Sequence, residues 1–469
     1  MTSTERLLIV IAVAVGVTVR ILMTALPAVP LRTKGVKAIS DAAEYEKLAL
    51  NLAHNRVFSR DTAPPFRPEL FRTPVYPLFL IPFCAIHWNT TLAVIIAQLL
   101  LSLLLIWVIR RLALELNLDR KTAAIAALFL AASPNLAFLS TKMVTETVFT
   151  LLLAVCLLLF NRFRQSLKTR DLIVAAICSG LLILTRPIAI LFPLVLTGYL
   201  IFYLFRNRRI RWYHPAIPVL CALIVVLPWV IRNGKLTGRY IISTAGEHNL
   251  FLYNAATVIA AERGINLSAA RDTMRKEAAE TFGSFDSTDK ARFWQRLAII
   301  ARSHIMRYPL LAAKVQFLGF IANFVSPISI QPLMIHSGIA LPQQPHVFQQ
   351  AVGLLTKGRI AAAAHLAWTE RLSHLGIFAW VVLVVSTVFQ LMLLVFCFIG
   401  LFTKPSRGLL WLLLPVCYFT ILTGPVGEAR FRAPIEPVLV LFAAVGLTAV
   451  VTCLPKERKP SSQDTSDSP

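Results

Sequence analysis

Apolar runs of about 17 to 20 residues recur along most of the chain, and they constrain its fold more than any other feature. A helix rising about 1.5 Å per residue needs a run of this length to cross the roughly 30 Å hydrocarbon core of a bilayer. Of the 469 residues, 57% are hydrophobic and only 15% are charged. That is too little charge to cover the surface of a water-soluble domain of this length. The pattern predicts an all-α integral membrane protein.

The formal net charge is +24, but the Lys and Arg residues gather in alternate connections between the apolar runs. This alternation follows the positive-inside rule and predicts that both termini are cytoplasmic, with an even number of spans. It also argues against nucleic acid as a partner. The ten predicted spans are Leu7–Leu26, Thr91–Ile109, Thr122–Leu139, Val144–Phe160, Leu172–Leu184, Ile188–Phe205, Pro215–Ile231, Leu375–Phe402, Leu409–Leu422 and Val438–Cys453.

Two long connections fall on the predicted extracytoplasmic side, Pro27–Thr90 and Gly234–His374. Within the second, Leu310–Ile330 is apolar enough to cross, but a crossing there would reverse the charge pattern of the spans that follow. We therefore expect it to lie outside, beside a basic amphipathic helix on the membrane surface. The predicted organisation is a transmembrane module at 1–233 with an external catalytic loop at 27–90, an external and interfacial region at 234–374, transmembrane helices at 375–454, and a disordered cytoplasmic tail at 455–469.

The first external loop contains a predicted amphipathic helix that begins at Asp41, with Glu44 and Tyr45 in its first turns. Asp41 and Glu44 have the spacing of a capping box, in which each side chain satisfies a backbone N–H group. The functional alternative is that Asp41 is a general base at the membrane surface. Both interpretations can hold, because a capping contact also fixes the side chain.

Basic and acidic residues recur at other positions on the predicted outer face. Arg72 precedes two closely spaced prolines, and it either extends to lipid headgroups or binds a substrate phosphate. Lys142 lies one helical turn before Glu146 and is predicted to be its structural partner, because a carboxylate at this depth requires one. Arg186 lies in a tight outward turn, as a lipid contact or as part of a phosphate site.

Arg430 and Arg432 lie in an external loop, against the positive-inside trend, which suggests a specific role for them. Glu247 belongs to a polar cluster with His248 and Asn249, where we expect acceptor choice to be determined.

Taken in order, these segments resemble the GT-C glycosyltransferases of the ArnT-like and protein O-mannosyltransferase-like superfamily. The resemblance covers the membrane part of the chain, whereas residues 263–374 match no pattern known to us. The segments that carry it are Asp41 in its Asp-Ala-Ala-Glu-Tyr run, Arg72-x-Pro74-x-x-Pro77, Thr145-Glu146, Thr185-Arg186-Pro187, Pro228-Trp229 through Arg232-Asn233, and Arg430-Phe431-Arg432 with Pro434 and Pro437.

The resemblance implies a GT-C-type helical bundle that moves a sugar from a polyprenyl-phosphate carrier to a lipid, glycan or protein acceptor, with inversion, outside the cell membrane. It implies that Asp41 is the catalytic acidic residue and that Arg72 holds the carrier phosphate. Many relatives have Asp-Glu where this chain has Asp41 and Ala42, which leaves the role of Glu44 open. Arg186, Arg430 and Arg432 would add cations that stabilise the leaving phosphate.

No cofactor is expected. The seven cysteines show no metal-ligand or disulfide spacing, and neither do His336, His346 and His365, so the sequence predicts metal-independent transfer. A lipid flippase or transporter is the main alternative, and a membrane scaffold is another. A transporter would carry more charged or broken spans deep in the bundle, and a scaffold would not need an Asp and several Arg on one side.

Overall fold

The computed structural model describes residues 3–24, 41–85, 90–206, 210–283, 290–329, 333–334, 337, 351, 354–355, 357–403, 407–425 and 427–453. Within these residues every regular element is helical, so the all-α prediction is confirmed. The predicted disordered tail at 455–469 and residues 27–40 of the predicted catalytic loop lie outside the described residues.

In the described residues, seven helical stretches are long and apolar enough to cross a membrane, and counting two bent helix pairs as spans raises the number to nine. The chain is a multi-pass membrane protein. The N-terminal stretches are formed by α1 (Ser3–Thr24), α4 (Thr90–Glu115), α5 (Arg120–Ala132), α6 (Pro134–Ser140), α7 (Glu146–Ser166), α8 (Thr169–Thr185), η1 (Pro187–Ala189), α9 (Phe192–Arg206), η2 (His214–Ala216) and α10 (Ile217–Thr237). The C-terminal part contains α19 (Ile377–Phe402), α20 (Arg407–Leu410), α21 (Leu413–Leu422), α22 (Ala429–Arg432) and α23 (Glu436–Cys453).

The seven stretches and the bent pair α5–α6 coincide with eight of the ten predicted spans. The other two, Leu172–Leu184 and Leu409–Leu422, correspond to helices shorter than 18 residues. Helix α8 packs between α7 and α10 inside the bundle, which places it among the spans. Ten crossings remain the prediction, because length and composition alone support seven to nine.

The predicted span Thr122–Leu139 is bent by 56° between α5 and α6. Ser133 adopts an extended backbone and its Oγ accepts a hydrogen bond from the N–H group of Leu136, which starts a new helix. Pro134 has no N–H group with which to continue the preceding one. The bend directs Ser133 and Asn135 toward Glu436 at the start of α23, and both donate hydrogen bonds to its carboxylate.

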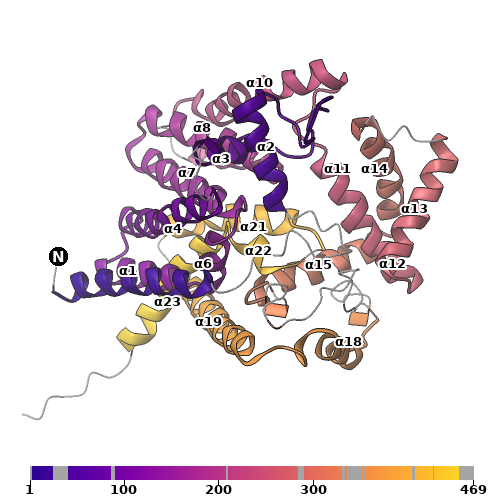
Figure 1. Cartoon of the computed structure of the whole chain (residues 1–469). Helices are drawn as coiled ribbons and strands as arrows, with labels where there is room; N and C mark the ends of the chain where they lie inside the picture. The colour runs from indigo at the N-terminus through magenta and orange to yellow at the C-terminus, as the bar shows by residue number, and fades with distance from the viewer. Residues whose placement is uncertain are drawn as a thin grey trace, which may run out of the picture.

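Helices α19 and α23 contact each other backbone to backbone (Figure 1). A Cβ atom built on Gly400 would lie 2.0 Å from the carbonyl oxygen of Phe442, and one built on Gly446 would lie 2.0 Å from that of Phe396. Small residues allow this approach, which is how many transmembrane helices associate. The pair fixes the C-terminal spans and, through the start of α23, the end of the loop that carries Arg430.

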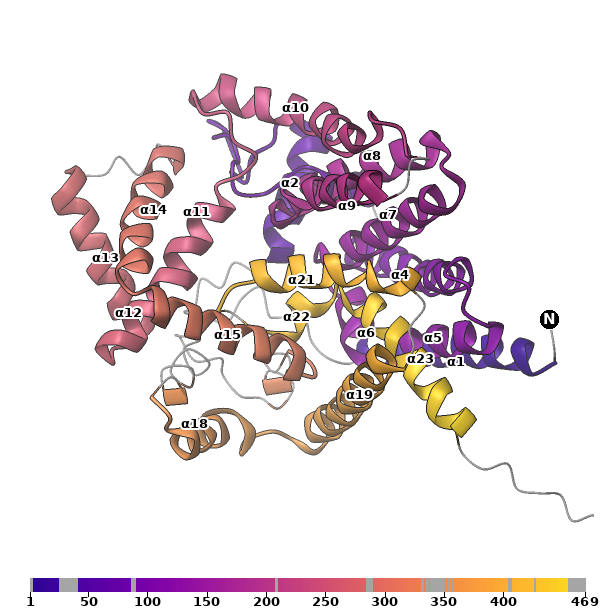
Figure 2. The same ribbon diagram turned by 180° about the vertical axis from the view of Figure 1, so that it is seen from behind.

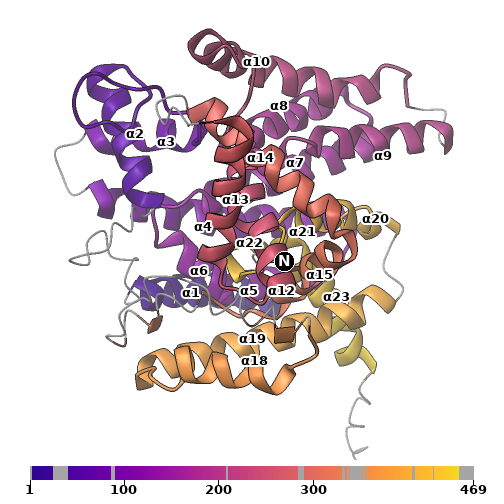
Figure 3. The same ribbon diagram turned by 90° about the vertical axis from the view of Figure 1, so that its right-hand side faces the viewer.

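The two long connections form two further groups of helices. The first loop forms α2 (Asp41–Asn55) and α3 (Val75–Ala85), which pack on each other through Tyr45, Ala49, Tyr76 and Leu80. The second loop forms α11 (Ala245–Asn249), the π-helical turn η3 (Leu250–Ala255), α12 (Ala256–Arg263), α13 (Leu267–Phe282), α14 (Lys290–Arg307), α15 (Pro309–Val325), α18 (Ile360–Ala367) and η4 (Trp368–Leu372). Figure 2 shows α11–α14 grouped to one side of the bundle, and in Figure 3 α12, α13 and α14 face the viewer.

Helices α11–α14 share a core of their own, separate from that of the spans, which includes Phe251, Ile259, Met274 and Leu297. This corrects one expectation. The predicted amphipathic helix exists as α14, but its apolar side is covered by α11, η3 and α13. The chain turns by 101° between α14 and α15. Large apolar side chains nevertheless stay exposed on both helices, Met306 of α14 and Leu310 and Phe317 of α15 among them. The prediction that Leu310–Ile330 lies against the bilayer therefore stays open.

Candidate functional site

Asp41 lies at the first turn of α2, and each of its carboxylate oxygens accepts a hydrogen bond from a different arginine. Arg72 Nη2 lies 2.5 Å from Oδ1, and Arg430 Nη2 lies 2.7 Å from Oδ2. Arg72 comes from the same loop, whereas Arg430 comes from the short helix α22 near the other end of the chain. Arg72 and Arg430, which the sequence predicted for one site, therefore both contact Asp41.

Arg72 is held on several sides. Its Nε and Nη2 lie 2.8 and 2.7 Å from Glu44 Oε2, and its Nη1 donates to the Tyr45 hydroxyl at 3.2 Å. The guanidinium also lies over the rings of Tyr45 and Phe71, 4.8 and 4.7 Å from their centroids. A planar group held by charge-assisted hydrogen bonds and ring contacts is strongly oriented.

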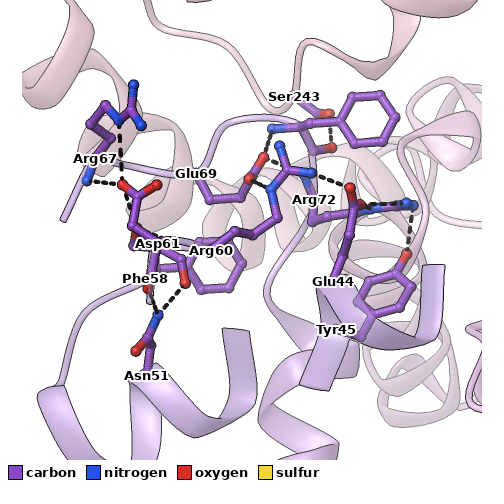
Figure 4. Close-up of polar contacts among 12 residues, drawn as sticks. Glu44, Tyr45, Asn51, Phe58, Arg60, Asp61, Arg67, Glu69, Arg72 and Ser243 are labelled. Atoms are coloured by element: carbon purple, nitrogen blue, oxygen red, sulfur yellow. Dashed lines mark hydrogen bonds and ion pairs between the residues drawn. The ribbon is translucent and has the colours of Figure 1, made fainter. Parts of the chain in front are cut away.

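A second ion-pair group supports this one from the loop between α2 and α3. Arg60 bridges the carboxylates of Glu44 and Glu69, and Figure 4 shows the side chains converging. Glu69 in turn accepts hydrogen bonds from the backbone N–H groups of Phe71 and Arg72. The loop thereby fixes the backbone on which Arg72 is carried. Arg60 and Glu69 were not predicted, since nothing in their spacing sets them apart from other loop residues.

Glu146 begins α7 and is fully buried, and the structure gives it partners other than the predicted one. Its Oε1 accepts from Arg186 Nη1 at 2.7 Å and also from Arg430 Nε. Lys142 instead lies 4.9 Å over the ring of Phe138. The predicted pairing of Glu146 with Lys142 is therefore wrong, and its ion-pair partners are two arginines distant in sequence.

The protonation of the site follows from these contacts. Burial by itself would raise the pKa of Asp41, but the charges of Arg430 and Arg72 outweigh it and lower that pKa below its ordinary value. Burial acts in the opposite direction on the two arginines, and the neighbouring acidic groups outweigh it, so the pKa of each is raised. Asp41 is thus an anion at neutral pH, between two cations.

These residues line a cavity of about 1240 Å³. Its charged wall comes from the first loop, α22 and their neighbours, and contains Asp41, Glu44, Arg60, Glu69, Arg72, Arg186, Glu428 and Arg430. A second, apolar part contains Ile188, Ile190, Leu191, Leu383 and Leu422. The third part comes from the second loop and includes His248, Asn249, Tyr253, Asn254, Phe293 and Trp294.

Four predicted site residues do not line this cavity, and one of them is Glu146, which is buried and pairs with Arg186 and Arg430. Arg432 is buried and donates to the carbonyl oxygens of Asn323 and Ser326 and to the carboxylate of Glu436, so the prediction that it binds phosphate is corrected to a structural role. Glu247 pairs with Arg239 at 2.8 Å, behind the wall that its neighbour His248 lines. Lys142 lies over the ring of Phe138 and is not among the lining residues. Tyr45, in contrast, lines the cavity.

In the part of the chain that the structure describes, no group of three or more His, Cys, Asp or Glu side chains is placed to hold a metal ion. Metal independence stays a prediction. The described charged groups of the cavity are suited to binding an anion through arginine and to accepting a proton through carboxylate.

Residues 71–231 match the sequence model of the family described as dolichyl-phosphate-mannose-protein mannosyltransferase. The predicted resemblance and the glycosyltransferase class are confirmed over this part of the chain. No curated protein matches the sequence. Asp41 and Arg430 both lie outside the matched residues.

Solved structures with a similar chain path include two membrane enzymes. One is the Archaeoglobus fulgidus oligosaccharyltransferase in complex with zinc and sulfate, with 13% identity, a TM-score of 0.47, and coverage of 95% of this chain and 49% of that one. The other is ArnT from Cupriavidus metallidurans bound to undecaprenyl phosphate, with 15% identity, a TM-score of 0.41, and coverage of 96% and 78%. The chain spans about half the length of the oligosaccharyltransferase.

Proposed function

We propose that this protein is an inverting membrane glycosyltransferase that moves a sugar from a polyprenyl-phosphate carrier to an acceptor hydroxyl on the extracytoplasmic side. The observation that carries the proposal is Asp41, held between Arg72 and Arg430 on the wall of a cavity that is charged on one side and apolar on another. A lipid-linked sugar phosphate requires this combination of a base, fixed cations and apolar surface.

The arginines supply the phosphate site. Arg186 and Arg430 converge on one oxygen of Glu146, so both guanidiniums lie close together at the cavity. The hydrogen bonds present use one nitrogen of Arg186 and two of Arg430, whereas a guanidinium offers five N–H groups on three nitrogens. The other N–H groups are suited to a phosphodiester, whose oxygens match the arginine fork.

The apolar part of the cavity is suited to the carrier lipid. Ile190 and Leu191, in the turn after Arg186, are about half exposed, and Leu422 at the end of α21 is 42% exposed. An isoprenoid chain passing over these residues would bury apolar surface at roughly 25 cal/mol per Å². The phosphate at its head would then reach Arg186 directly, because Arg186 and the apolar turn are consecutive in sequence.

In the proposed step, the proton of the acceptor hydroxyl passes to a carboxylate oxygen of Asp41. The acceptor oxygen forms a bond to the anomeric carbon from the face opposite the phosphate, and the bond from that carbon to the phosphate oxygen breaks. Its electron pair remains on the phosphate, which leaves as polyprenyl phosphate. Fixed arginines stabilise that charge without having to reorient.

The ion pairs also suggest an order of binding. While Arg72 and Arg430 occupy both oxygens of Asp41, its low pKa makes it a weak base. A donor phosphate competes for the same guanidiniums, and any weakening of their contacts with Asp41 raises its pKa toward the ordinary value. The donor then activates the base that its own transfer requires.

The test is sugar transfer from a polyprenyl-phosphate donor by the full chain in nanodiscs. Asp41→Asn keeps the size of the side chain and an amide oxygen that can still accept a hydrogen bond from Arg72 or Arg430, so it should retain the fold and donor binding. It should lose about 100-fold or more in transfer rate. Glu44→Gln tests whether the neighbouring carboxylate shares the role, and Glu46→Gln on the same helix is the matched control. A stable Asp41→Asn protein with unchanged transfer contradicts the proposal.

A further inference from the structure

The charged residues that line the cavity are distributed unevenly over its surface. All eight charged residues that line it come from the first loop, the turn after α8, and the segment around α22. Every described lining residue from the second loop is uncharged, although that loop is rich in arginine, lysine and glutamate. We use the term neutral wall for nine of these second-loop lining residues, namely Thr244, Ala245, Gly246, His248, Asn249, Tyr253, Asn254, Phe293 and Trp294. A ligand held there meets no ionic partner from it.

An aromatic row joins the neutral wall to the catalytic arginine. Arg72 lies over the ring of Phe71, the rings of Phe71 and His248 are 4.8 Å apart, and those of His248 and Trp294 are 4.4 Å apart. The row therefore runs from the guanidinium that contacts Asp41 to the far side of the cavity. His248 belongs to it as a neutral ring at physiological pH, because burial lowers its pKa to about 4.

Hydrogen-bonding groups stand beside this row. Asn249 and Tyr253 are one helical turn apart, Asn254 follows, and all three line the cavity. Among the described residues, the Tyr253 hydroxyl and the Asn254 amide take no hydrogen-bond partner. Polar groups in a cavity that meet no protein partner are suited to a ligand with hydroxyl groups.

Hydrogen bonds hold the backbone of the neutral wall in place. Arg271 donates from Nε and Nη2 to the carbonyl oxygen of Leu252, at 2.9 and 2.7 Å, and so fixes the π-helical turn. The segment before α11 is joined to the first loop by Thr244 N–H donating to Leu70 and by the Ser243 hydroxyl donating to Phe71. Side chains on a fixed backbone can discriminate among ligands because little ordering is needed on binding.

We propose that the neutral wall is the acceptor subsite and that the acceptor is an uncharged saccharide. The proposal rests on the proposed function and names its acceptor class. The C–H faces of a sugar ring pack on aromatic rings, and its hydroxyls exchange hydrogen bonds with amide, phenol and imidazole groups. A phosphorylated or carboxylated acceptor would leave its charge against a wall without cations. A sugar on the row would present a hydroxyl toward Phe71 and, beyond it, Asp41.

The experiment uses the full chain in nanodiscs with a panel of polyprenyl-phosphate hexoses and pentoses. Three acceptor sets are compared: neutral methyl glycosides and disaccharides, the same sugars carrying a phosphate, and a peptide rich in serine and threonine. We expect transfer to the neutral sugars. Trp294→Ala should raise the acceptor KM at least about tenfold and leave the donor KM unchanged, whereas Trp294→Phe should retain most of the activity.

Asn254→Ala is a second variant, because it removes a hydrogen-bonding group without touching the core behind Trp294, and it should raise the same KM. Trp212→Ala is the matched control, since Trp212 is 84% exposed and is not among the residues that line the cavity. Transfer to phosphorylated sugars or peptide alone overturns the saccharide proposal and leaves the proposed function standing. An unchanged acceptor KM in both folded variants overturns it too. If a total extract of membrane glycans and proteins also receives no sugar from any donor, the proposed function fails, and this proposal with it.

Discussion

Arg186 and Arg430 donate hydrogen bonds to the same oxygen of Glu146, although the two arginines come from opposite halves of the chain. One buried carboxylate thereby holds two guanidiniums beside each other. Like charges at this distance repel, so their position depends on Glu146. The donor phosphate would supply a second negative charge to the same pair.

Glu146→Gln removes the negative charge between Arg186 and Arg430, so the two guanidiniums should move apart. We expect kcat/KM for the donor to fall at least about tenfold, because a phosphate site built from oriented guanidiniums depends on their geometry. Glu115→Gln is the matched control, since Glu115 also pairs with two arginines, Arg111 and Arg162, but away from the cavity. Equal activity of the two variants, both folded, would remove Glu146 from the site.

Arg72→Lys should raise the donor KM, since lysine retains the charge but cannot reproduce the fork that contacts Asp41 and Glu44 together. The loss of a charge-assisted contact predicts a change of roughly tenfold, about 1.4 kcal/mol. Arg67→Lys in the same loop is the control, because Arg67 is exposed and pairs with Asp61. A donor KM that does not change in Arg72→Lys would leave this arginine with a structural role.

The pH dependence tests the electrostatics of Asp41. Its pKa is depressed in the folded protein, so Asp41 stays ionised as the pH falls and activity should persist well into the acidic range. Arg430→Lys weakens one of the two contacts and should raise that pKa, which moves the acidic limb of the rate profile to higher pH. The measurement is kcat/KM for the donor, which reports the enzyme before the donor binds, from about pH 3 to about pH 8. A shift toward lower pH would contradict the assignment of Asp41 as the base.

Arg432 should matter for stability and not for donor binding. Arg432→Met leaves Glu436 buried without its ionic partner, and we expect a loss of about 3–5 kcal/mol, seen as a lower Tm. Combining it with Glu436→Leu should recover part of that loss. Arg263→Met, which breaks an exposed pair with Glu262, should change Tm little. A raised donor KM in folded Arg432→Met protein would instead support the prediction that Arg432 binds the donor phosphate.

Orientation in the membrane can be measured by cysteine labelling in a background without the seven native cysteines. We expect an impermeant reagent to label Thr281→Cys on α13 in intact cells and to label Ser166→Cys at the end of α7 only after permeabilisation. The positive-inside rule predicts this orientation, with α13 outside and the end of α7 in the cytoplasm. The reverse pattern would place the cavity in the cytoplasm and exclude an extracytoplasmic transfer.

Much of the fold was predictable because span length and charge alternation are local properties. The apolar runs located α1, α4, α7, α10 and α19 to within a few residues. The bend at Ser133 was missed, although Ser-Pro inside an apolar run is a signal for it. The covered side of α14 was missed because its partner helices had no pattern from which packing could be inferred.

The site was predictable only in part. Asp41, Arg72, Arg186 and Arg430 do meet, as their shared outer face suggested. The two arginines of α22 differ by two positions in sequence and point to different surroundings, which only the packing of α15 decides. Arg60 and Trp294 carry no local signal, because each acquires its role from contacts made across the fold.

The contact between Asp41 and Arg430 joins positions 389 residues apart. A ribosome completes the first external loop long before it makes α22, so the nascent chain carries Asp41 for most of its synthesis without one of the two cations that surround it in the finished protein. Under the proposed mechanism, the growing polypeptide cannot consume carrier lipid. Catalytic competence would arrive only after α22 has been made, and chains truncated before α22 would be inert in the membrane.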